Sequence, residues 1–246
     1  MKKIATALFL FISMAVMALP ASADTTYTVT INSAGPQNTA GVYVYPYHFT
    51  VTENPSGLPQ TEQMMCLDFD RDVTPVQTWQ ATLVPITSGA SVSNNDPLLT
   101  TTDLEVLAVL DSEIRAATTG SQAVDDLQFA AWSINASYDD MHTGLHHAGF
   151  THAAANDLLA AQNAVNNSGT PGVSATDANN NLVTYDDYSY FNPVGALLGA
   201  PQRFMLYTPG FVSQGGPPAV PEPSSLMLLG TGVLGLAGLA RRRFKA

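Results

Sequence analysis

Residues 103–117 read DLEVLAVLDSEIRAA, and the spacing of their apolar side chains decides the fold class. Apolar residues stand at positions 104, 107, 110 and 114, a period that predicts one buried face of a helix. Thr102 or Asp103 is expected to cap the start of this helix. Two more helices are predicted at 124–137 and 151–167, so the middle of the chain is helical.

The sequence on either side of these helices favours β-strands. Four stretches before them are predicted strands, at 26–31, 41–51, 65–69 and 78–86. Pro46, inside the second, indicates a sheet edge or a bulge. After the helices, a polar loop at 168–181 is followed by two returning strands, at 183–191 and 203–209. We therefore expect a mainly β fold, a sandwich or barrel with two or three inserted α-helices, α+β overall.

The two ends of the chain differ from the body between them. Residues 1–23 combine a basic start, an apolar core and the small-residue sequence PASA, as in a cleaved signal peptide. Residues 224–240 carry no charge and predict a single transmembrane helix. Arg241, Arg242 and Arg243 follow it, which places the tail end in the cytoplasm. Residues 24–208 are then one β-rich domain, joined to the tail by a Gly/Pro linker at 209–220.

The tail also resembles a known sorting signal. Pro221, Glu222 and Pro223, the apolar helix and the arginine cluster occur in the order of the PEP-CTERM signal of Gram-negative bacteria. The resemblance implies that an exosortase recognises residues 221–223 and removes the tail. It also implies transient anchoring in the inner membrane, then release to the cell surface or the exopolysaccharide matrix. A simple tail anchor is the alternative.

The charge of the body limits its partners. The chain carries a formal net charge of −11, and all but one of its 20 acidic residues lie before Pro221. The bases between residues 24 and 220 are Arg71, Arg115 and Arg203, with no lysine. Because phosphate backbones are bound by basic surfaces, nucleic acid is not an expected partner.

Cys66 is the one cysteine of the chain. Exported proteins usually pair their cysteines, so a lone thiol has four interpretations. It forms a disulfide with another molecule, it is reactive, it is buried and inert, or it attacks a glutamine amide to give an internal thioester.

Two short segments favour the thioester. Met65-Cys66-Leu67 on a predicted strand, and Leu127-Gln128-Phe129-Ala130-Ala131-Trp132 on a predicted helix, resemble the thioester domains of bacterial surface adhesins. The resemblance implies a Cys66–Gln128 cross-link that an amine or hydroxyl on a partner surface or matrix polymer attacks. Trp132 lies four residues after Gln128 on the same helix face and is expected to shield the bond from water.

Two other clusters, one of aspartates and one of histidines, predict no metal site. Asp68, Asp70 and Asp72 alternate as in a calcium loop, but the glycine and glutamate of the EF-hand pattern are missing, so they predict a solvated strand face. The cluster at 142–152 contains four histidines, which are read as loop residues rather than a metal site; they are His142, His146, His147 and His152. No cofactor or metal is expected.

The sequence thus predicts an exported adhesin-like protein that is not an enzyme. One alternative is a non-covalent structural protein of the exopolysaccharide or biofilm matrix, in which Cys66 is buried and inert. A second alternative is a secreted enzyme that processes polysaccharide with acidic residues.

Overall fold

The computed structural model describes residues 25–38, 41–69, 74, 76–87, 99–136, 150–168, 171–194 and 201–209. All of them belong to one compact unit, Asp24–Val212. Within these residues no helix combines the length and hydrophobicity that a membrane span needs. The predicted signal peptide, sorting motif and transmembrane helix at 224–240 lie outside the described residues.

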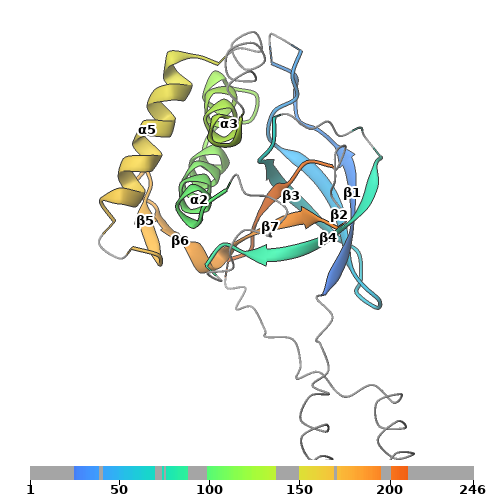
Figure 1. Ribbon diagram of the computed structural model, residues 1–246. Coiled ribbons are helices and arrows are strands. Elements are labelled where there is room, and N and C mark those ends of the chain that lie inside the picture. Colours follow the sequence, from blue (N-terminus) through green and yellow to red (C-terminus); the bar gives the residue numbers. More distant parts are fainter. Residues whose placement is uncertain are drawn as a thin grey trace, which may run out of the picture. The chain divides into compact units, whose positions relative to one another are not determined.

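Six antiparallel strands form a closed barrel (Figure 1). Their order around the barrel is β1-β2-β3-β8-β7-β4. Their bounds are β1 Thr26–Ser33, β2 Tyr47–Glu53, β3 Gln60–Cys66, β4 Thr78–Pro85, β7 Tyr188–Pro193 and β8 Phe204–Tyr207. The prediction of a β-fold with inserted helices is confirmed, and the sheet is a barrel. Because the barrel is closed, β8 at the end of the domain pairs with β3 near its start.

Two predicted strands were misplaced. The strand predicted at 41–51 begins at Tyr47, after Pro46, whose nitrogen has no hydrogen to donate to a sheet. The strand predicted at 65–69 is β3, which begins earlier and ends at Cys66. Its first residues are polar and mostly exposed, and only its last three are buried. The apolar pattern of the sequence therefore predicts only the second half of this strand.

Among the residues that the structure describes, three α-helices lie between β4 and β7 in the sequence and pack together beside the barrel (Figure 1). They are α2 Thr101–Ala116, α3 Gln122–Asn135 and α5 His152–Asn166. Helix α3 contacts both other helices and also strand β3 of the barrel. Since it has neighbours on several sides, most of its residues are buried, well beyond one apolar stripe.

The cap predicted for α2 was wrong in position. Thr100 is the N-cap, and its hydroxyl accepts a hydrogen bond from the Asp103 backbone nitrogen at 3.2 Å. The Asp103 carboxylate in return accepts one from the Thr100 nitrogen at 2.8 Å. This reciprocal capping box starts the helix at Thr101, so Thr102 lies in its first turn.

A hairpin replaces part of the predicted polar loop. Strands β5 Ser174–Thr176 and β6 Leu182–Thr184 pair with each other, and β5 contacts α5. The central residue of each strand, Ala175 and Val183, is buried. Three-residue strands are too short to show a reliable alternation in the sequence, which explains why the hairpin was not predicted.

Candidate functional site

Cys66 is the last residue of β3, at the point where the barrel meets α3. It pairs with Phe204 of β8, is fully buried, and is a free cysteine. Its thiol donates a hydrogen bond to the Asp68 carbonyl oxygen at 3.3 Å. The barrel therefore holds the sulfur inside the domain, facing the helical layer.

Gln128 lies in the middle of α3 and is also fully buried. Its side-chain Nε2 donates to the Cys66 carbonyl oxygen at 2.8 Å, across 62 positions of sequence. Its Oε1 has no hydrogen-bond partner among the residues that the structure describes. The structure thus brings together the two residues that the sequence paired, with the amide oxygen unused.

Trp132 lies one turn after Gln128 and is 2% exposed. Its ring packs against Phe69 at 5.3 Å and against Phe129 at 5.2 Å between ring centroids. Phe69 follows Cys66 by three residues, so these aromatic contacts join the segment after β3 to α3. They place apolar rings beside the segment that carries Cys66.

The thiol is protonated at neutral pH. Burial raises the pKa of Cys66 well above its ordinary value, because an apolar interior disfavours the thiolate. The adjacent Trp132 side chain lowers this pKa in part, although its indole nitrogen makes no hydrogen bond of ordinary geometry within the described residues. Nucleophilic attack by this sulfur therefore requires that its proton leaves during the reaction.

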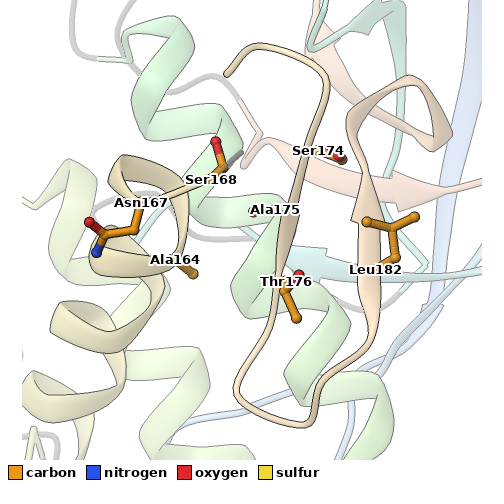
Figure 2. Close-up of a pocket in the computed structure, with 7 residues that line it drawn as sticks. All are labelled: Ala164, Asn167, Ser168, Ser174, Ala175, Thr176 and Leu182. Atoms are coloured by element: carbon orange, nitrogen blue, oxygen red, sulfur yellow. The ribbon is translucent and has the colours of Figure 1, made fainter. Parts of the chain in front are cut away.

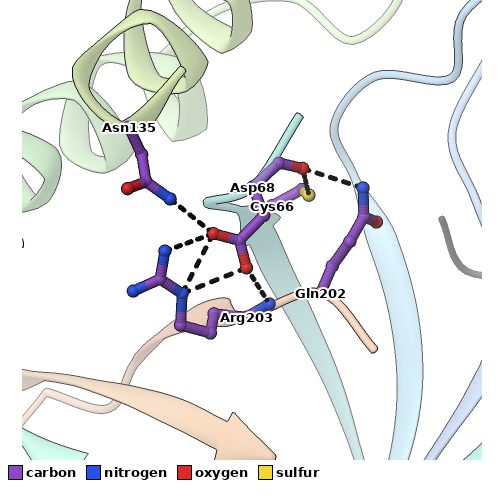
Figure 3. A network of polar contacts seen from close by, with 5 residues as sticks. All are labelled: Cys66, Asp68, Asn135, Gln202 and Arg203. Atoms are coloured by element: carbon purple, nitrogen blue, oxygen red, sulfur yellow. Dashed lines mark hydrogen bonds and ion pairs between the residues drawn. The ribbon is translucent and has the colours of Figure 1, made fainter. Parts of the chain in front are cut away.

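A buried ion pair lies directly beside the thiol (Figure 3). Asp68 and Arg203 are both fully buried and form an ion pair. Asn135, the last residue of α3, donates to the same carboxylate at 2.6 Å. The prediction of a solvated strand face is therefore wrong for Asp68, because this side chain turns inward to an arginine; Asp70 and Asp72 lie outside the described residues.

Asn135, Gln202 and Arg203 were not predicted as part of this site. Gln202 donates from Nε2 to the Asp68 carbonyl oxygen at 2.8 Å, the oxygen that also accepts from the thiol. One signal was available, since Arg203 is among the few bases of an acidic body. A buried arginine needs an acidic partner, but the sequence shows neither that Arg203 is buried nor which acid pairs with it.

A pocket of about 370 Å³ lies elsewhere, between the end of α5 and the β5–β6 hairpin (Figure 2). It shares no lining residue with the Cys66 site. Its walls are small or uncharged side chains, including Asn167, Ser168 and Thr176.

No metal site emerges from the part of the chain that the structure describes. There, no group of three or more His, Cys, Asp and Glu side chains could hold a metal ion. His152 begins α5, whereas His142, His146 and His147 lie outside the described residues.

Comparison with known proteins identifies the tail. The PEP-CTERM protein-sorting motif matches residues 219–243. The match contains the predicted motif residues 221–223 and the arginines at 241–243. No curated protein and no solved structure matches the chain.

The chain therefore carries an exosortase sorting signal. The motif implies a protein that is exported, held at the membrane, processed by an exosortase and sorted to the cell surface. The matched residues cover the end of the linker and the tail, so the motif assigns no role to the body.

Proposed function

We propose that the exported body is an adhesin-like domain in which Cys66 and Gln128 condense to an internal thioester. The contact between the two residues carries this proposal. The Gln128 amide nitrogen lies 2.8 Å from the Cys66 carbonyl oxygen, and both residues are fully buried. A thioester needs its acyl carbon close to its sulfur in a site shielded from water, and both the contact and the burial support this arrangement.

The condensation balances without an external reagent. The Cys66 sulfur attacks the side-chain carbonyl carbon of Gln128, an S–C bond forms, and the C–N bond breaks. The amide nitrogen leaves as ammonia and takes the thiol proton. A partner amine or hydroxyl later attacks the same carbon, the C–S bond breaks, and Cys66 regains a proton. The Gln128 acyl group then carries a covalent bond to the partner.

The composition of the body suits a stored acyl group. Residues 24–220 contain no lysine, so no lysine of the body competes with an external amine. The Trp132 and Phe69 rings pack together beside the buried site and help to exclude water, which slows hydrolysis. The proposed partner is therefore an amine- or hydroxyl-bearing polymer of a surface or matrix, met after exosortase sorting.

Intact mass tests the proposal. The full chain is expressed with its own terminal segments in an exosortase-bearing Gram-negative host, and the exported form is purified. We expect a mass about 17 Da below the calculated value, the mass of one ammonia, and a thiol released by methylamine. Cys66→Ala and Gln128→Met should each have the full calculated mass.

The matched control is Gln122→Ala, which removes an exposed glutamine from the same helix. This variant should keep the mass deficit. A parent protein with the full calculated mass and a free thiol would contradict the thioester.

A second function is favoured by a specific observation. The thiol is buried and protonated, and it already donates to the Asp68 carbonyl, as expected of an inert structural cysteine. The body would then be a non-covalent structural protein of the exopolysaccharide or biofilm matrix. In that case Cys66→Ala should change adhesion only as far as it changes stability.

A further inference from the structure

We infer that Asp68, Arg203 and Asn135 form a positioning clamp that holds the Cys66 thiol against the Gln128 amide. The inference rests on the proposed function and adds residues to it that the adhesin resemblance does not name. These three residues come from the segment after β3, the segment before β8 and the end of α3.

The Asp68 carboxylate is held from several directions (Figure 3). Oδ2 accepts from the Arg203 backbone nitrogen at 2.7 Å. Both carboxylate oxygens accept from Arg203 Nε at 3.0 Å, and Oδ1 also accepts from Arg203 Nη2. Asn135 Nδ2 adds a bond to Oδ1 at 2.6 Å. With so many charge-assisted donors, the carboxylate has one orientation available.

The same residue holds the thiol through its backbone. The Asp68 carbonyl oxygen accepts from the Cys66 thiol at 3.3 Å and from Gln202 Nε2 at 2.8 Å. The Leu67 nitrogen also donates to the Arg203 carbonyl at 2.9 Å. Residues 66–68 are therefore attached to the chain before β8 by main-chain and side-chain bonds, and the position of the sulfur follows from them.

Helix α3 links the Gln128 amide to the Asp68 carboxylate. Asn135 lies seven residues after Gln128, which places the two on one face of the helix, two turns apart. When Asn135 bonds to Asp68, this face is held against the segment that carries Cys66. Both reacting groups are thus located relative to a single buried carboxylate.

Stability alone does not require this arrangement. A buried ion pair loses its hydration, and well-packed apolar residues of similar volume are often as stabilising. The ion pair instead fixes the orientation of the Asp68 segment, because its hydrogen bonds allow one geometry. Displacing a reacting atom by about 1 Å costs on the order of 100-fold in rate, so the position of the sulfur matters for condensation.

The domain contains a matched control for this idea. Asp111 is also fully buried and also bonds an arginine, with 2.5 Å between its Oδ2 and Arg115 Nε. That pair lies on α2, and Arg115 also donates to the Gln63 carbonyl. Asp111→Asn therefore weakens the ion pair of a second buried aspartate, whose arginine is 25% exposed, without touching the carboxylate beside Cys66.

The test compares folded full-length variants. Asp68→Asn and Asn135→Ala are expressed beside Asp111→Asn and Ser133→Ala, the latter changing a neighbouring polar residue of α3 whose hydroxyl bonds to Ala130. The fraction that has lost ammonia is followed by mass spectrometry after expression is stopped, and the folded fraction by urea unfolding. We expect condensation about 100-fold slower in the two clamp variants and unchanged in the two controls.

Each outcome decides the matter. Folded clamp variants with free thiol and intact glutamine, beside controls that condense normally, support the clamp. If all four variants condense like the parent, the network is only structural and the clamp is overturned, while the thioester stands. If the parent itself keeps its full mass, both proposals are overturned. Should Asp68→Asn fail to fold, Asn135→Ala decides alone, since it leaves the Asp68–Arg203 ion pair in place.

Discussion

Two arginines of this acidic body form ion pairs with buried aspartates. Arg203 pairs with Asp68, and Arg115 pairs with Asp111 and lies over the Tyr207 ring at 4.9 Å. In both pairs the aspartate is fully buried. A buried carboxylate without a cation would be strongly destabilising, so the described arginines are explained by the acids that they accompany.

Arg115→Met is expected to destabilise the domain by about 3–5 kcal/mol at pH 7, because it leaves Asp111 buried without its cation. Burial raises the pKa of Asp111, and Arg115 opposes that rise, so removing Arg115 raises this pKa further. A raised pKa means that the folded state binds the proton more tightly than the unfolded state, and stability is lost as pH rises past the unfolded value. The cost should therefore be smaller at pH 4 than at pH 7.

Urea unfolding at the two pH values, with parent and variant side by side, measures this difference. An equal loss of stability at pH 4 and pH 7 would show that the charge of Asp111 does not cause the destabilisation. Leu58→Met, at an 82% exposed position, serves as the control for a change that touches no ion pair.

At the scale of elements, the site depends on how α3 meets β3. The sequence predicted a helix around Gln128 and a strand around Cys66, and both are present. The apolar pattern of α3 does not reveal its burial, since α2, α5 and β3 all contact it. Asn135 can be buried there because its side chain bonds to the carboxylate of Asp68, in the segment after β3.

Thr100→Ala is expected to cost about 1 kcal/mol, because it removes the N-cap hydroxyl of α2 and half of the capping box. Thr102→Ala, two residues later in the same run of threonines, should cost only a few tenths of a kcal/mol. Thermal or urea unfolding of the two variants measures both changes. A larger loss for Thr102→Ala would contradict the cap position described above.

At the scale of the whole molecule, closure of the barrel brings distant segments together. Cys66 pairs with Phe204 across the β3–β8 ladder, and Arg203 stands one residue before that strand. The Asp68–Arg203 pair therefore spans 135 positions of sequence. The same closure encloses the aromatic core, in which Phe49 and Phe204 lie 4.6 Å apart between ring centroids.

Glu222→Ala is expected to block processing of the sorting signal, which matches residues 219–243. The variant should keep its tail and stay with the cell envelope, because the charged residue of the motif is gone. Gln214→Ala in the preceding linker is the control and should be processed normally. Mass analysis of the envelope and released fractions, repeated in a host without exosortase, measures this. Normal release of Glu222→Ala would contradict the role of the motif.

The sequence by itself determined the local features: the helices from their period, most strands from their alternation, and the sorting signal from its tail. It also paired Cys66 with Gln128 through a resemblance, and these residues contact each other in the structure. Such features depend on residues close together in the chain or on a motif with defined spacing.

Only the tertiary structure decided that the sheet closes as a barrel, and that Asp68 is buried against Arg203 rather than solvated. The pattern of alternating aspartates predicts an exposed strand face, and nothing near Asp68 in the sequence contradicts it. Its partner comes from the far end of the domain, and pairing between such distant segments is set by closure of the whole sheet. Local sequence patterns do not depend on that closure, so they cannot predict which residues lie around the thiol.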